Sequence, residues 1–207
     1  MSASKPLSVT VLENGPLKIA GENITVRYCG EPVTVEEGKP LFLCRCGESE
    51  NAPFCDGSHS RTNFVAEPPA GARRELRVWE GQTIRTFFNP NACMHVFYCK
   101  PLKELRAREQ AGDASAAAEI ARVVRSCPSG ALSYELKGET ALADAEPDAQ
   151  VDVEIVEGGE LRIQCGFEIN NELQERQAAD RATLCRCGLS KNKPWCDGRH
   201  RKRENFR

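Results

Sequence analysis

The chain has 207 residues, 40% of them hydrophobic and 6% aromatic, and its 28 basic and 30 acidic side chains leave a formal net charge of −2. So small a charge excludes steering of a partner by the field of the whole molecule. No apolar run approaches the roughly 18 residues of a membrane-spanning helix, and residues 1–11 have neither a signal-peptide core nor an arginine-rich transit character. We therefore expect no membrane contact.

The first part of the chain carries a constellation of metal-ligating side chains. Cys44, Cys46, Cys55 and His59 belong to a segment that is predicted to be a small module of short β-strands. Residues two apart in an extended segment point to the same side, and residues four apart on a helical turn share one face. Each pair can therefore reach one metal. The sequence predicts a site with three thiolates and one imidazole.

The middle of the chain is predicted to be an α+β unit. A linker is expected at residues 67–71, and residues 83–88 are a strand candidate. One helix is predicted to begin at Pro101 and to end near residue 112, because proline suits the first turn of a helix. A second helix is predicted over residues 113–126 with Asp113 as its N-cap, since a short carboxylate accepts the free N–H groups of a first turn.

Three cysteines of the middle unit indicate another metal site. Cys93 and Cys99 are six residues apart with Val96 midway between them, and Cys127 is followed by proline. Val96 cannot bind a metal, so the neighbouring His95 is a candidate for a further ligand; the alternative is a histidine that only shields the site. Cys127 also falls on the apolar face of the second helix, which could make it a buried helix-end cysteine. That face would equally aim its thiolate inward, so the two interpretations are compatible.

The end of the chain repeats its beginning. Residues 138–152, rich in Ala, Asp and Glu, are predicted to be a connection, and residues 152–207 then repeat residues 15–66. Cys185, Cys187, Cys196 and His200 have the same intervals as the first constellation. The sequence therefore predicts an α+β protein with three domains: a β-rich module over residues 1–66, the middle domain over residues 72–137 and a second β-rich module over residues 152–207.

Both outer constellations resemble the CDGSH iron-sulfur domain of the NEET proteins. The resemblance includes the Cys-x-Cys pair and the Cys-Asp-Gly-x-His tail of each module. It implies two 2Fe-2S clusters, each held by three cysteines and one histidine. In the first module Cys44 and Cys46 would hold the inner iron and Cys55 and His59 the outer one. Cys185, Cys187, Cys196 and His200 would do the same in the second. It also implies an intertwined pair of modules, here within one chain and as a monomer.

Two observations qualify that resemblance. Three cysteines and one histidine also make a tetrahedral zinc site, but zinc pairs usually have the spacing Cys-x2-Cys, so the repeated one-residue gap favours iron and sulfur. In addition, the second motif has Arg199 where the first has Ser58. A hydroxyl that could support the site is replaced by a cation, and we expect the two clusters to differ in their properties.

The middle unit resembles the divergent single-cluster ferredoxins. In bacterial-type ferredoxins a Cys-x2-Cys-x2-Cys run is completed by a cysteine before proline. Here Val96 fills the middle position of that run. The resemblance implies that Cys93, Cys99 and Cys127 hold either a 3Fe-4S cluster or a 4Fe-4S cluster whose fourth iron takes another ligand. Cys29 and Cys165 lie outside all three constellations, and we expect them to be small buried core residues.

These features predict function only to a class. No nucleotide-binding fingerprint or catalytic set stands out, so we expect no enzyme. The leading hypothesis is a cytoplasmic multi-cluster electron-transfer protein, since cluster-bound cysteines fit a reducing compartment. The alternatives are storage and transfer of clusters to an apo-acceptor, or a redox or pH sensor that acts through a partner. Histidine ligation predicts pH-sensitive 2Fe-2S centres.

The expected partners follow from the same features. They are a reductase, flavoprotein or ferredoxin, or an acceptor of clusters. The basic residues around the second motif could dock an acidic redox partner; they are Arg199, Arg201, Lys202, Arg203 and Arg207. No aromatic stacking platform accompanies them, so nucleic acid is not expected.

Overall fold

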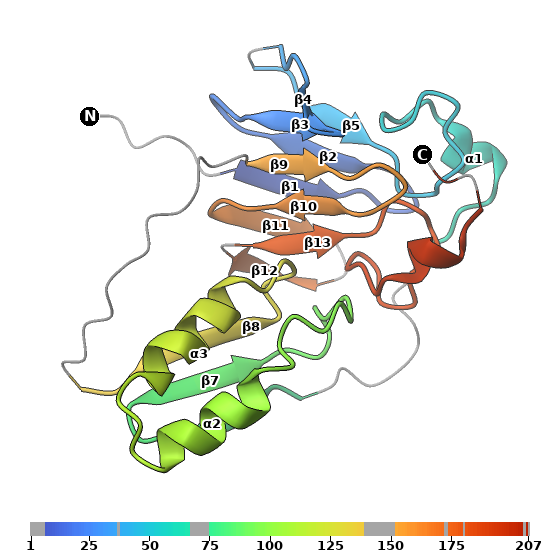
Figure 1. Cartoon of the computed structure of the whole chain (residues 1–207). Helices are drawn as coiled ribbons and strands as arrows, with labels where there is room; N and C mark the ends of the chain where they lie inside the picture. Colours follow the sequence, from blue (N-terminus) through green and yellow to red (C-terminus); the bar gives the residue numbers. More distant parts are fainter. Residues whose placement is uncertain are drawn as a thin grey trace.

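The computed structural model describes residues 7–36, 38–66, 75–138, 152–171, 174–179, 181–204 and 206. Within these ranges the chain is α+β, as predicted: two five-stranded sheets lie beside a smaller three-stranded sheet that carries two helices (Figure 1). The expected linker at residues 67–71 lies outside the described residues, as does most of the connection over residues 138–152. No described helix is long and apolar enough to cross a membrane.

Each outer module supplies five short strands and one helical turn. The first has β1 (Leu7–Val11), β2 (Leu17–Ala20), β3 (Val26–Tyr28), β4 (Glu31–Pro32), β5 (Leu41–Leu43) and the helix α1 (Ser58–Arg61). The second has β9 (Val153–Ile155), β10 (Leu161–Ile163), β11 (Phe167–Asn171), β12 (Gln174–Ala179), β13 (Ala182–Leu184) and the 3-10 helix η1 (Arg199–Lys202). Alternate residues of β1 are buried, which is the pattern of a strand with one face against a core.

The two modules exchange strands. One sheet has the order β12-β11-β1-β2-β5 and the other β13-β10-β9-β3-β4, so each contains three strands of one module and two of the other. The joining pairs are parallel: β1 lies beside β11, and β3 beside β9. A pseudo-two-fold axis that interchanges the modules therefore maps one sheet onto the other. A single apolar core between the sheets is built from both modules, including Val9, Leu17, Ile155 and Leu161.

The middle domain has its own core. Its sheet has the order β6 (Arg77–Glu80), β7 (Ile84–Phe88), β8 (Leu132–Leu136). The helices α2 (Leu102–Gln110) and α3 (Ala116–Arg125) bury Leu105, Ile120 and Val124 against Ile84. The predicted strand and both predicted helices are confirmed. The predicted N-cap is wrong: α3 begins at Ala116 after Ser115, because Asp113 uses its carboxylate to accept the Ser115 N–H at 2.9 Å in the preceding turn.

The two cysteine loops that follow β5 and β13 meet at the pseudo-two-fold axis. Gly47 and Gly188 both have positive φ, and a Cβ atom at Gly188 would lie 2.5 Å from the Cys46 carbonyl oxygen. Arg203 ties the loops together, because its guanidinium donates to the Cys187 oxygen at 2.7 Å and to the Gly47 oxygen at 2.9 Å. Only glycine fits this backbone approach without strain.

We predict that Gly188→Ala is much more harmful than Gly30→Ala. Gly30 has a similar positive φ but nothing within 4 Å of a Cβ atom, so its substitution tests the backbone penalty alone, about 1 kcal/mol. Gly188→Ala adds a collision with the Cys46 carbonyl, and it should lower the thermal midpoint by roughly 5 to 15 °C. Circular dichroism of the cluster-loaded variants measures both midpoints. Equal losses would mean that the two loops separate without cost.

Candidate metal centres

The first outer site consists of two close pairs of ligand atoms. Cys44 and Cys46 follow β5 directly, and their sulfurs lie 3.5 Å apart. Cys55 and His59 lie on either side of a turn, with 3.4 Å between Cys55 Sγ and His59 Nδ1. All four predicted side chains are thus placed around one end of the sandwich, and it is Nδ1 of the histidine that faces the cysteine.

Hydrogen bonds of the intervening loop hold the two pairs in register. The Ser49 hydroxyl donates to the Phe54 carbonyl at 2.6 Å. The Asp56 carboxylate accepts the N–H groups of Glu50 and Ser58, each at 2.9 Å, and these donors keep the pKa of Asp56 well below its usual range. Gly57 then adopts a left-handed conformation that starts α1 and presents His59.

The second outer site repeats this arrangement. The sulfurs of Cys185 and Cys187 lie 3.8 Å apart, and Cys196 Sγ lies 3.4 Å from His200 Nδ1. Ser190 donates to the Trp195 oxygen at 2.6 Å, as Ser49 does to Phe54. The Asp197 carboxylate accepts the Lys191 N–H at 3.0 Å. It also accepts from Arg199 Nε at 2.9 Å, and this ion pair takes the place of the hydrogen bond between the Ser58 side chain and Asp56 in the first motif.

Two local expectations about these ligands are wrong. Cys44 and Cys46 do not lie in an extended segment: they follow the end of β5, where the chain bends, and their sulfurs are 3.5 Å apart. Cys55 precedes α1 and does not share a helical face with His59. The turn through Gly57 brings these two side chains together instead. Spacing predicted which side chains lie together, but loops produce the geometry.

The spacing of the ligand atoms fits two metals better than one. A single tetrahedral zinc with bonds of about 2.3 Å holds all its sulfurs roughly 3.8 Å apart. Within the described part of the chain, no three of Cys44, Cys46, Cys55 and His59 have ligand atoms that all lie within 4.8 Å of one another. The first site therefore offers two separate pairs, which is the ligand arrangement for one iron per pair. At the second site the ligand atoms of Glu160, Cys196 and His200 lie within 4.8 Å of one another, and neither Cys185 nor Cys187 joins that group.

The sites favour thiolates that lose their protons to a bound metal. Burial raises the pKa of Cys46 to about 11 and that of Cys196 to about 12, so these thiols lose their protons only when a metal binds. Backbone N–H groups point at the sulfurs, among them Gly47 to Cys44 and Gly198 to Cys196, both at 3.3 Å. Such donors stabilise negative charge on sulfur.

A buried arginine stands between the two cysteines of each Cys-x-Cys pair. Arg45 and Arg186 are 2% and 1% exposed. Arg45 donates to the carbonyls of Gly15 and Leu12 at 2.8 and 2.7 Å, and burial lowers its pKa to about 10 while the Cys185 thiolate of the other module opposes the shift. Cys44 acts in the same way on the pKa of Arg186, which burial also lowers. Each guanidinium thus supplies positive charge near the sulfurs of both sites.

One residue that the sequence reasoning missed distinguishes the second site. The Glu160 carboxylate lies 3.5 Å from His200 Nε2, the ring nitrogen that faces away from Cys196. Glu160 is 3% exposed and binds Arg162 at 2.9 Å. In the first module the corresponding residue is Pro16, between the matching Gly15 and Leu17. The signal was this single Glu-for-Pro difference between the repeats.

The middle constellation is more open. Cys93 lies in the loop after β7, Cys99 lies just before α2, and Cys127 follows α3; all three are half-buried, and the last two pack on the middle core. His95 is exposed, and its Nδ1 lies 3.8 Å from Cys93 Sγ. Among the described residues, this constellation has no three ligand atoms within 4.8 Å of one another. In a cuboidal cluster each cysteine binds its own iron, so the sulfurs need no mutual contact.

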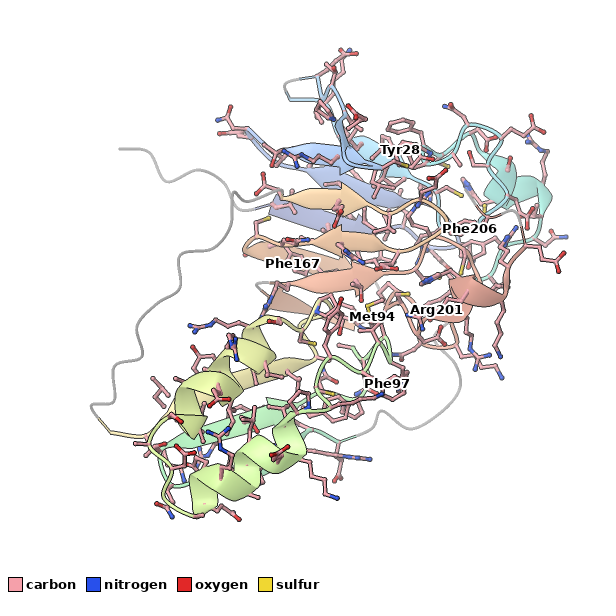
Figure 2. All side chains as sticks on the ribbon, viewed as in Figure 1. Tyr28, Met94, Phe97, Phe167, Arg201 and Phe206 are labelled. Atoms are coloured by element: carbon pink, nitrogen blue, oxygen red, sulfur yellow. The ribbon has the colours of Figure 1, made fainter. Side chains whose placement is uncertain are left out.

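The Cys93 loop packs on the second outer site. Asn192 donates its side-chain N–H to the Asn91 carbonyl, and a Cβ atom at Gly198 would lie 2.9 Å from the Met94 oxygen. Met94 is 2% exposed, and Figure 2 shows it beside Arg201 at the junction of the two domains. The middle constellation is therefore adjacent to Cys196 and His200.

The two remaining cysteines have different surroundings. Cys165 is half-buried against the shared core, and burial raises its pKa to about 12, which fits the expected structural residue. Cys29 is exposed, so the expectation of a buried core residue is wrong for it. Its positive φ of 54° places it in the turn between β3 and β4, where its side chain leaves the sandwich.

Comparison with known protein families agrees with this arrangement. Residues 14–60 and 152–201 match the family model described as iron-binding zinc finger CDGSH type. Residues 79–137 match the model described as divergent 4Fe-4S mono-cluster. No curated protein and no solved structure matches the chain.

Proposed function

We propose that this iron-sulfur protein transfers single electrons. The chain carries two CDGSH-type iron-binding domains, one on either side of a divergent 4Fe-4S mono-cluster domain. The proposal is for a carrier that does not itself transform a substrate. The observation that carries it is the contact between all three cysteine constellations, each of which touches the next through the backbone of its ligand loop.

The described ligand sets support two 2Fe-2S clusters and one 3Fe-4S or 4Fe-4S cluster. Cys44, Cys46, Cys55 and His59 would hold the first, and Cys185, Cys187, Cys196 and His200 the second; Cys93, Cys99 and Cys127 would hold the third. Such clusters take up and release one electron at a potential that is set by charge, hydrogen bonds and exposure. The chain supplies these through its buried arginines and the N–H groups aimed at sulfur.

The contacts between the loops suggest an order for electron transfer. The Met94 backbone lies against Gly198 beside Cys196, and the Cys187 oxygen and Cys46 oxygen face Gly47 and Gly188 across the pseudo-two-fold axis. The second outer site is thus between the middle site and the first outer site. Electrons that pass between the middle site and the first site would therefore pass through the second.

Cluster transfer is the alternative function, and one observation favours it. Cys55 and His59 are only half-buried, so an acceptor could reach the outer pair of the first site. A redox or pH sensor would use the same histidine. The expected partners are a reductase, flavoprotein or ferredoxin for electron transfer, and an apo-acceptor for cluster transfer. Cytoplasmic location and a monomeric state remain part of the proposal.

Electron transfer and cluster transfer predict different fates of the metal. We expect the oxidised protein to take up electrons from a flavoprotein reductase and pass them to ferricyanide over many cycles with its iron retained. Under the same anaerobic conditions, transfer of clusters from the protein to an all-cysteine apo-ferredoxin should take far longer than one cycle of reduction and reoxidation. Visible absorption follows both processes. A chain that loses its clusters as fast as they are reduced would contradict the electron-carrier function.

The composition of the middle cluster can be tested at Val96. With three cysteine ligands we expect a 3Fe-4S centre, which is paramagnetic when oxidised, whereas oxidised 2Fe-2S centres are silent. Electron paramagnetic resonance of the oxidised protein should show this signal, and Val96→Cys should remove it by completing a 4Fe-4S site. A signal that appears only on reduction would instead indicate four irons, and its loss in His95→Ala would make His95 the fourth ligand.

Histidine ligation predicts acid lability of the second site. Burial lowers the pKa of His200 below its unfolded value of about 6.5, with Glu160 opposing the shift. Stability from neutral His200 is therefore fully present above pH 6.5 and is lost as pH falls through the lower folded pKa. His200→Cys should slow bleaching of that cluster in mild acid, with His59→Cys as the matched change in the first site. Unchanged bleaching in both variants would argue against histidine ligation.

A further inference from the structure

The two outer sites differ in how their histidine is held. His200 has its distal nitrogen, Nε2, 3.5 Å from the Glu160 carboxylate, which is itself fixed by Arg162. In the first site Pro16 occupies the place of Glu160 and offers no side-chain acceptor; a Cβ atom at the adjacent Gly15 would lie 3.9 Å from His59 Nε2. A carboxylate that accepts the second N–H of a metal-bound histidine orients the ring and raises its basicity.

The sites also differ in exposure. Cys196 and His200 are 4% and 8% exposed, whereas Cys55 and His59 are half-buried. A ligand that leaves iron must be replaced by one from the acceptor, so the outer pair has to be reachable. Only the first site meets this condition in the described structure.

The middle domain adds a third difference, because it covers one site only. Its Asn91 and Met94 carbonyls lie against Asn192 and Gly198, which flank the second cysteine-histidine pair. At the first site, a Cβ atom on the corresponding Gly57 would meet nothing within 4 Å. Access to the second cluster from this direction would require the middle domain to move.

We propose that the two outer sites have separate roles: the second retains its cluster as a fixed electron relay, and the first exchanges its cluster with an acceptor that offers free cysteine thiols. This inference rests on the proposed function. The exchange involves no change of oxidation state. Four acceptor thiolates form bonds to the two irons as the bonds to Cys44, Cys46, Cys55 and His59 break. The protons of the acceptor thiols pass to the three released cysteines and to His59 or solvent.

Alkylation of released thiols can measure the two sites separately. The cluster-loaded chain is mixed anaerobically with excess all-cysteine apo-ferredoxin, samples are quenched with iodoacetamide at intervals, and peptide mass spectrometry quantifies modified Cys55 and Cys196. We expect Cys55 to be modified at least tenfold faster than Cys196. This comparison uses the unaltered protein, so it tests the proposal even if a variant fails to fold.

Variants then test the part played by Glu160 as a positioning residue. Glu160→Gln should speed modification of Cys196 by about 10-fold or more, which is the usual effect of losing such a partner. It should also raise the midpoint potential of the second cluster, which a merely structural residue would not do. Glu154→Gln is the matched control: Glu154 also binds Arg162, at 3.2 Å, but is not paired with His200. Pro16→Glu, beside Lys18, should slow release from the first site.

The outcomes separate this proposal from the function on which it rests. Equal modification of Cys55 and Cys196, or faster modification of Cys196, overturns the division of roles while reversible reduction of the clusters remains. If folded Glu160→Gln leaves the rate of Cys196 modification and the midpoint potential of the second cluster unchanged, the proposed role of Glu160 is overturned. If the loaded chain shows no reversible one-electron reduction at all, the electron-carrier function itself fails, together with the relay role of the second site.

Discussion

The exchange of strands between the two outer modules is the constraint on which the rest of the structure depends. Neither module closes a sheet alone, because β1 completes its sheet beside β11 and β3 beside β9. The apolar core is accordingly common to both modules. The ligand loops follow β5 and β13 of this shared sandwich. The exchange of strands therefore also brings Cys46 and Cys187 together at the pseudo-two-fold axis. Two sites that are about 140 residues apart in the chain thereby become neighbours.

Charge inside the sandwich links cluster loading to this fold. Arg45 and Arg186 are buried near sulfurs of both modules, and a buried cation is costly unless an anion compensates it. Burial raises the pKa of the Cys46 and Cys196 thiols, so these two provide that anion only when a cluster binds. Cations and clusters therefore stabilise each other across the axis. Removal of one cluster would leave Arg45 and Arg186 with less compensating negative charge. We therefore expect it to lower the stability of the neighbouring site as well.

Sequence spacing predicted which cysteine and histidine side chains lie together, but not the arrangement around them. Cys44, Cys46, Cys55 and His59 lie within one short stretch of the chain, so their intervals alone predict that the four side chains come together. The strand exchange could be expected only from the resemblance, because parallel pairing of distant strands leaves no local signal. Modules as small as these bury little apolar core on their own, and the structure shows that the two outer modules share one core. Glu160 was missed for two reasons. Its partner His200 is 40 residues away in the sequence, and a glutamate is expected to be exposed unless something marks it as buried.

The asymmetry of the outer sites follows from having both copies in one chain. In a pair of identical modules any substitution appears twice, so both sites must change together. Here Pro16 and Glu160 occupy equivalent places in separate copies and can differ. The middle domain strengthens this difference for a geometric reason: a single domain packed to one side of a pseudo-two-fold axis can cover only one of two equivalent sites. It lies on the second site, against Asn192 and Gly198, and so its own constellation is adjacent to the more enclosed outer cluster site. In the proposed function, adjacency of the redox sites and protection from exchange therefore arise from the same contact.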